Sequence, residues 1–171
     1  MVGEWDLVKI IQYNPFKNKK SLYLSTTNSL STCLFYILMS NSFYNVWIHA
    51  VFATKDRQHL ISLDLEEVLY PFLYDEFSQL GCKLKIVNGL TDHIHCLFML
   101  DAKKSYAEVM KQIKGTSSHY INEHNFIFEK FAWQKGYAVF SVSHYDVESV
   151  YEFIKKQKMK KESLEEEGIK L

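Results

Sequence analysis

The segment that most constrains the fold of this chain is a short run that opens with two histidines. Asp92-His93-Ile94-His95 leads directly into the apolar residues 96–100, a pattern typical of a buried strand. Successive side chains of a strand point to opposite faces, so His93 and His95 share one face with Cβ atoms roughly 7 Å apart. Two imidazoles at that spacing can bind one divalent ion. Because the chain has 7 histidines, two hydrogen-bonded structural side chains explain the pair equally well.

The hydrophobic pattern predicts alternating strands and helices around this segment. Strands are expected at 44–54, 82–90, 93–100 and 137–142, and helices at 63–80, 105–122 and 146–161. Gly81 is expected to end the first helix, Pro71 to kink or restart it, and Ser105 to cap the second. The short link between the second and third strands makes them antiparallel neighbours. This order predicts an α+β fold, a ferredoxin-like antiparallel sheet with helices mainly on one face.

Length and composition restrict the class of protein. A chain of 171 residues with 47% hydrophobic residues is sufficient for one domain with a core. Its 20 basic and 20 acidic residues balance, so the net positive charge typical of nucleic-acid binding is absent, and only local lysine clusters such as 155–161 could contact DNA. Cys33, Cys82 and Cys96 form no C-x-x-C pair, which favours reduced thiols in the cytoplasm. No apolar run reaches the ~20 residues that a membrane helix needs.

Residues 1–38 differ in character from the rest of the chain. They are polar and irregular up to Ser31 and then end in a short apolar run, and Met39 follows directly. We therefore expect residues 1–38 to be an N-terminal extension produced by a mis-assigned start, and residues 39–171 to form the functional domain. A native N-terminal sequence beginning near Met1 would refute this hypothesis.

Five segments in a fixed order carry a resemblance to a known protein family. They are residues 46–57, 92–95, 113–118, 133–143 and 153–157. In this order they resemble the HUH-type (His-hydrophobic-His) single-tyrosine transposases of bacterial insertion sequences, so that residues 39–171 would form a transposase-like HUH domain. The resemblance implies a ferredoxin-like fold and a homodimer whose composite active site takes its histidines from one subunit and its tyrosine helix from the other. It also implies binding of single-stranded DNA hairpin ends, with metal-dependent strand cleavage and rejoining in DNA transposition.

The resemblance further implies the residues of a metal site. In the family, the two histidines and a glutamine hold Mg or Mn, which corresponds here to His93, His95 and Gln157. The family's last segment reads Tyr-Ile-x-x-Gln, and its tyrosine forms a covalent link to the DNA 5′ end. Phe153 occupies the tyrosine position in this chain. Phenylalanine has no hydroxyl to attack phosphorus, so cleavage is expected to be impaired. Tyr151 is a less favoured substitute, because on a helix it lies roughly 160° around the axis from Phe153.

Four residues are candidates for DNA contacts. Arg57, the only arginine, could bind a phosphate bidentately or form a surface ion pair. Lys114, Ser117 and Ser118 belong to a segment that resembles the family's helix near bound DNA, although serines on a helix can simply bond to the preceding turn. His49, in the first strand, is expected to be structural or to face solvent.

Three functions follow as hypotheses. The leading one is a transposase-family protein whose cleavage is impaired at Phe153. One alternative is a non-catalytic, repressor-like DNA-binding module of ferredoxin-like fold, in which the histidine pair is vestigial. The other is a metal-dependent hydrolase that uses His93 and His95, for which no strong third ligand stands out. Metal content and a covalent DNA adduct would separate the three.

Overall fold

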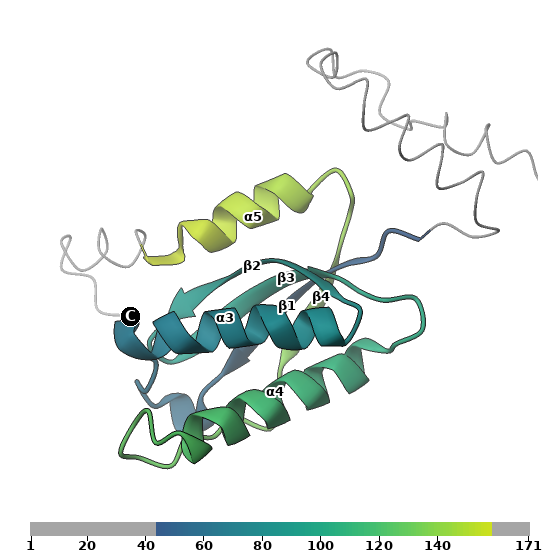
Figure 1. Ribbon diagram of the computed structural model, residues 1–171. Coiled ribbons are helices and arrows are strands. Elements are labelled where there is room, and N and C mark those ends of the chain that lie inside the picture. The colour runs from purple at the N-terminus through teal and green to yellow at the C-terminus, as the bar shows by residue number, and fades with distance from the viewer. Residues whose placement is uncertain (1–43, 159–171) are drawn as a thin grey trace, which may run out of the picture. The chain divides into compact units, whose positions relative to one another are not determined.

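The computed structural model describes residues 44–158, drawn as coloured ribbon in Figure 1. The predicted extension at residues 1–38 and the C-terminal tail from Met159 lie outside the described residues. The elements in chain order are β1 (Trp47–Ala53), the short 3₁₀ helix η1 (Lys55–Arg57), α3 (Leu63–Gln79), β2 (Lys83–Leu90), β3 (His93–Met99), α4 (Tyr106–Glu123), β4 (Ala138–Val142) and α5 (Val147–Lys155). Among residues 44–158, no helix is long and apolar enough to cross a membrane.

The four strands form one antiparallel sheet in the order β2-β3-β1-β4. Helices α3 and α4 lie on one side of this sheet and α5 lies on the other (Figure 1). The predicted α+β fold is therefore confirmed, with two of the three helices sharing a face. The predicted strands and helices all occur, with ends that differ by a few residues; α5 is regular from Val147 to Lys155, and residues 159–161 of the predicted helix lie outside the described residues.

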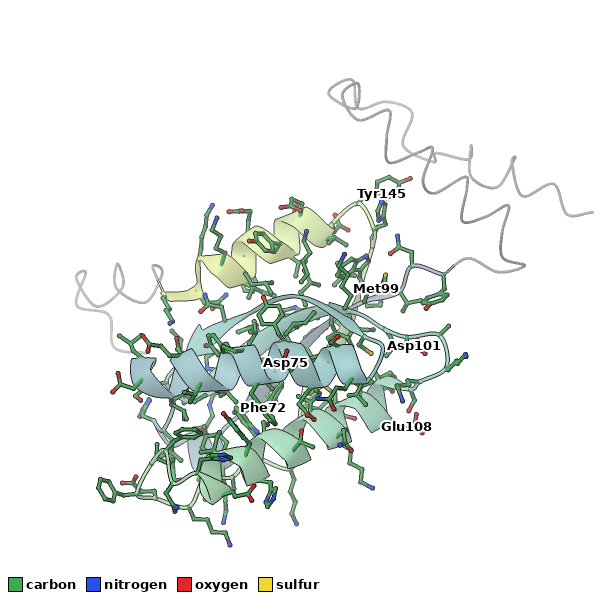
Figure 2. All side chains as sticks on the ribbon, viewed as in Figure 1. Phe72, Asp75, Met99, Asp101, Glu108 and Tyr145 are labelled. Carbon is green, nitrogen blue, oxygen red and sulfur yellow. The ribbon has the colours of Figure 1, made fainter. Side chains whose placement is uncertain are left out.

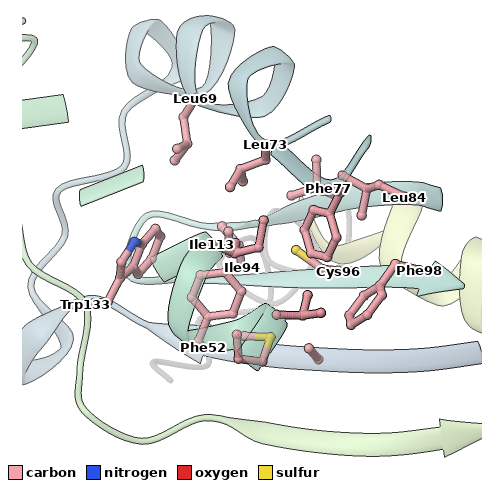
Figure 3. Close-up of a cluster of buried hydrophobic side chains, with 14 of the residues drawn as sticks. Phe52, Leu69, Leu73, Phe77, Leu84, Ile94, Cys96, Phe98, Ile113 and Trp133 are labelled. Carbon is pink, nitrogen blue, oxygen red and sulfur yellow. The ribbon is translucent and has the colours of Figure 1, made fainter. Parts of the chain in front are cut away.

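The central strand β3 is buried on both faces, and its two faces have different uses. Ile94, Cys96 and Phe98 point into the main core, where they pack with residues of β1, α3 and α4 (Figure 3). Leu97 points the other way and packs against α5 in a second, smaller cluster. His93 and His95 alternate with the core residues and so share the α5 side of the sheet. The core therefore fixes the strand that carries the histidine pair.

Helix α3 runs continuously from Leu63 to Gln79 through Pro71, so the predicted alternative of a helix restart there is wrong. Four buried residues, one turn apart, hold the helix on the sheet: Leu65, Leu69, Leu73 and Phe77. Pro71 lies on the exposed side, so the carbonyl group that its ring leaves unpaired can be solvated. Packing of the apolar stripe thus keeps the helix continuous through the proline.

The ends of the two helices on this face follow the predicted signals. Gly81 adopts φ 72° just after α3, the left-handed conformation that favours glycine at a helix C-terminus. Ser105 caps α4 in a reciprocal arrangement with Glu108, as each side chain bonds the other residue's backbone N–H. Between the helices, the Phe72 ring stacks on that of Tyr120 at 4.1 Å (Figure 2 labels Phe72). These contacts fix the helix pair beneath the core face of the sheet.

Candidate functional site: a histidine cluster beneath helix α5

The tight β2–β3 hairpin places the two histidines at the start of the central strand. Gly89 of β2 pairs with Ile94, which lies between His93 and His95. A Cβ atom built on Gly89 would lie 2.1 Å from the His93 carbonyl oxygen and 2.7 Å from the Ile94 Cα. Only glycine allows the two backbones to approach so closely. The hairpin therefore fixes the backbone from which both imidazoles project.

A third imidazole joins the pair from the neighbouring strand. Nε2 of His49, in β1, lies 2.9 Å from Nδ1 of His95, and the two rings stack with centroids 5.2 Å apart. The strand register explains this contact, because Val51 pairs with His95 and His49 lies two residues before Val51 on the same face. The prediction that His49 is merely structural or solvent-facing overlooked this contact.

Burial keeps the central imidazole neutral. His95 is only 8% exposed, and this burial, with the nearby His49 and His93, lowers its pKa from 6.5 to about 4. Burial also lowers the pKa of His49. Near pH 7 these rings are uncharged, which is the form of histidine that binds a metal ion.

His93 is oriented by the residue just before it. Its Nδ1 lies 2.7 Å from Oδ1 of Asp92, whose Oδ2 lies 3.2 Å from Nε of Arg57. Burial alone would raise the pKa of Asp92, but the hydrogen bond from His93 and the charges of His93 and Arg57 lower it overall. Arg57 is thus in the predicted ion pair, although its side chain remains 64% exposed.

The residues present fit a divalent cation. The Nδ1 atoms of His93 and His95 are both engaged, by Asp92 and by His49, which leaves Nε2 of each ring as the ligand atom. The two ring centroids are 5.2 Å apart. Among residues 44–158, no group of three or more His, Cys, Asp or Glu side chains is arranged to hold a metal. Further ligands would therefore be amide oxygens, water or phosphate.

Gln157, the predicted amide ligand, comes just after Lys156, the C-cap of α5. Its Nε2 donates to the Phe153 carbonyl oxygen at 3.3 Å, an exposed contact of the last helical turn. A cation would bind the side-chain oxygen, since the amide nitrogen has no lone pair to offer. Gln157 therefore belongs to the same end of α5 as Phe153.

Phe153 lies against the histidine cluster of its own chain. Its ring meets His95 and His49 edge-on, with centroids 5.9 Å and 6.3 Å away, and the side chain is 48% exposed. Helix α5 is tied to β2, because Nδ2 of Asn88 donates to the carbonyl oxygens of Ile154 at 2.8 Å and Lys155 at 3.2 Å. The residue at the tyrosine position thus reaches the histidines within one chain.

Tyr151 packs on a different side of α5. Its ring is partly buried against the smaller cluster, and the Lys85 and Lys155 ammonium groups lie 5.0 Å and 6.0 Å from its centroid. Lys85 also pairs with Glu148 at 3.2 Å. These contacts favour the expected role of Tyr151 as a packed amphipathic ring between α5 and β2.

The ammonium group of Lys114 donates hydrogen bonds to backbone carbonyl groups of its own chain. Its Nζ donates to the carbonyl oxygens of Gln134, Lys135 and Gly136 at 2.6, 3.1 and 2.9 Å, and it lies 5.3 Å from the Tyr137 ring centroid. An ammonium group has three donors, so all three are used. Burial lowers the pKa of Lys114. Its contacts favour a structural role over the predicted contact with DNA.

The hydroxyl groups of the two serines in the same segment also bond within the protein. Ser117 is fully buried: its Oγ donates to the Ile113 carbonyl at 2.6 Å and accepts from Nε1 of Trp133 at 2.9 Å. Ser118 donates to the Phe131 carbonyl at 3.1 Å. A side chain with no exposed surface cannot contact DNA directly, so the prediction for Ser117 is replaced by a core role. Of the four predicted DNA-contact residues, Arg57 is the one with a largely exposed charged group.

Comparisons with known proteins agree with this architecture. The family model described as "Transposase IS200 like" matches residues 42–157, and the chain belongs to that family. No curated protein sequence matches the chain significantly. A solved protein assigned as a transposase from Deinococcus radiodurans R1 is 22% identical, with a TM-score of 0.56 over 69% of this chain and 95% of that one. A REP-associated tyrosine transposase bound to a REP hairpin is 13% identical, with a TM-score of 0.54 over 70% and 72%. Both similarities show the fold.

Proposed function

We propose that this chain binds single-stranded DNA ends, folded as hairpins, at the α5 face of its sheet as a cytoplasmic homodimer. His93, His95 and Gln157 would hold Mg or Mn for strand cleavage and rejoining in DNA transposition. Strand cleavage is impaired because Phe153 has no hydroxyl. The observation that carries the proposal is the position of the Phe153 ring, edge-on to His95 at 5.9 Å, in a chain of the IS200-like transposase family. A hairpin partner is supported by the related tyrosine transposase, which was solved with a REP hairpin.

The chemistry of the site follows from the residues around Phe153. A cation bound there would neutralise charge that develops on the scissile phosphate oxygens. His93 and His95 would present their Nε2 atoms to the cation, and Arg57, which pairs with Asp92 beside them, would supply a positive charge for the phosphate. With a tyrosine at position 153, the phenolic oxygen would form a bond to phosphorus. The bond from phosphorus to the 3′-oxygen would break, and that oxygen would take up the proton. The DNA 5′ end would remain on the protein.

The test is to compare the protein with its Phe153→Tyr variant. Each would be incubated with labelled single-stranded DNA that carries the ends of the source element, in the presence of Mn²⁺, and run on a denaturing gel. We expect a covalent adduct only with Phe153→Tyr. The matched control is Phe153→Tyr combined with His95→Ala, which keeps the new hydroxyl and removes a metal ligand, and it should form no adduct.

Other outcomes would favour the alternatives. An adduct with the unmodified protein that disappears in Tyr151→Phe would make Tyr151 the nucleophile. DNA binding without an adduct in any variant would favour the repressor-like, non-catalytic module. The metal-dependent hydrolase has the least support, because no third acidic, cysteine or histidine ligand joins His93 and His95 among the described residues.

A further inference from the structure

We infer that His49 is a positioning residue for the metal site: it accepts a hydrogen bond from Nδ1 of His95 and thereby leaves Nε2 of His95 free to bind the cation. This inference rests on the metal site of the proposed function. The observation behind it is the contact of 2.9 Å between His49 Nε2 and His95 Nδ1. His49 lies on β1, a different strand from the histidine pair.

The direction of this hydrogen bond decides whether His95 can bind a metal. A neutral imidazole carries one N–H, on either Nδ1 or Nε2. If His49 donated, Nδ1 of His95 would accept and its proton would lie on Nε2, the atom that must be unprotonated to coordinate. If His95 donates, its Nε2 has a free lone pair and His49 carries its own proton on Nδ1.

The two metal-ligand candidates therefore acquire the same tautomer from different partners. Nδ1 of His93 faces the Asp92 carboxylate at 2.7 Å, and an ionised carboxylate only accepts. His95 has no such carboxylate in its contact, and an imidazole from β1 takes that place. Partners of this kind fix the ring orientation of a ligand and raise its basicity.

The surroundings of His49 hold its ring in place for this role. It stacks on His95, and the rings of Phe140 and Phe153 lie 5.9 Å and 6.3 Å from it. The backbone of His49 is paired on both sides, with Leu97 of β3 and Phe140 of β4. The proposed hydrogen-bond acceptor of His95 is thus positioned by a strand in the middle of the sheet rather than by a loop.

The first measurement needs no metal and no DNA. Long-range ¹H–¹⁵N spectra of the metal-free protein near pH 7 report which imidazole nitrogen of each histidine carries the proton. We expect His95 to be protonated on Nδ1 and His49 to be unprotonated on Nε2. A His95 protonated on Nε2 would overturn the inference.

The second measurement is Mn²⁺ affinity by calorimetry, compared across variants. His49→Phe keeps a ring of similar size but has no acceptor, so we expect its affinity to fall 10–100-fold. His49→Gln offers a side-chain oxygen to the same N–H and should bind within a few-fold of the original protein. His119→Gln is the matched control, since that histidine is 78% exposed and pairs only with Glu123 on α4.

The results separate failure of this inference from failure of the proposed function. Equal Mn²⁺ affinity in the original protein and in His49→Phe would refute the positioning role and leave the metal site intact. No Mn²⁺ binding by the original protein would refute the metal site itself, and with it the role of His49. If His49→Phe does not fold, the spectra of the original protein and the affinity of His49→Gln still decide the question.

Discussion

The hydroxyl group of Ser117 illustrates how a polar side chain in a DNA-related segment can belong to the core. It lies between α4 and Trp133, where it donates to one carbonyl and accepts the indole N–H. A buried polar group is stable only when its partners are present. Through Ser117, helix α4 is thus hydrogen-bonded to the segment that precedes β4.

We predict that Ser117→Ala lowers the free energy of unfolding by about 1–3 kcal/mol, because it leaves the buried Trp133 N–H without an acceptor. Urea denaturation followed by tryptophan fluorescence measures this change. Thr116→Ala is the matched control, since that hydroxyl bonds only to carbonyl groups of its own helix and its residue is half-buried rather than buried. A Ser117→Ala protein of unchanged stability but weakened DNA binding would instead support the original prediction of a DNA contact.

At the scale of single elements, the β2–β3 hairpin requires a glycine at position 89, whereas helix α4 does not require one at position 115. Gly89 lies where the two strands approach most closely, whereas a Cβ on Gly115 of α4 would meet nothing within 4 Å. The same substitution is therefore expected to have opposite effects at the two positions.

We predict that Gly89→Ala destabilises the protein by at least about 1–3 kcal/mol, because the added methyl group collides with the backbone of His93 and Ile94. Gly115→Ala should stabilise it by about 0.5–1 kcal/mol, since alanine is the better helix former. Thermal and urea unfolding of both variants test the pair. A Gly89→Ala protein as stable as the original would contradict the described approach of the two strands.

The elements could be predicted from sequence because their signals are local. Alternating apolar residues define the strands, and Ser105 and Gly81 mark helix ends by their own chemistry. The continuity of α3 through Pro71 could not be predicted, because it depends on the proline facing solvent while the opposite stripe packs on the sheet. Local signals do not say which face a neighbouring element will cover.

The site was predictable only where its parts are close in sequence. His93, His95 and Asp92 form one motif, but His49 is 46 residues from His95, and Asn88 is 66 residues from the Ile154 carbonyl that it binds. Those contacts depend on strand register and helix docking, which a single sequence does not specify. For the same reason, nothing in the sequence indicated that three carbonyl groups would occupy Lys114.

At the scale of the whole molecule, the described chain brings Phe153 and the histidine cluster together within one chain. The resemblance to transposases implies a composite site shared by two subunits, whereas here Phe153 reaches His95 of the same chain. The helix that carries Phe153 is tied to its own sheet by Asn88 and by the cluster of Val147, Ile154, Ile86 and Leu97. This geometry favours a site that is complete within each subunit of the proposed homodimer.

We predict that a tyrosine introduced by Phe153→Tyr acts only with the histidines of its own chain. A tagged chain with Phe153→Tyr and His95→Ala would be co-expressed with the unmodified chain, which has the histidines but no tyrosine. No DNA adduct is expected, because neither chain has both parts. Phe153→Tyr alone is the positive control. An adduct on the tagged chain would show that α5 exchanges between subunits.

The half-exposed setting of the Phe153 ring has a consequence for inheritance. The side chain is 48% exposed, so a hydroxyl can be added or removed there with little change in packing. The codons for phenylalanine and tyrosine differ by a single nucleotide. Under the proposed function, one point mutation would therefore convert a gene for a DNA-cutting protein into a gene for a DNA-binding one, or the reverse, while the encoded fold stays the same.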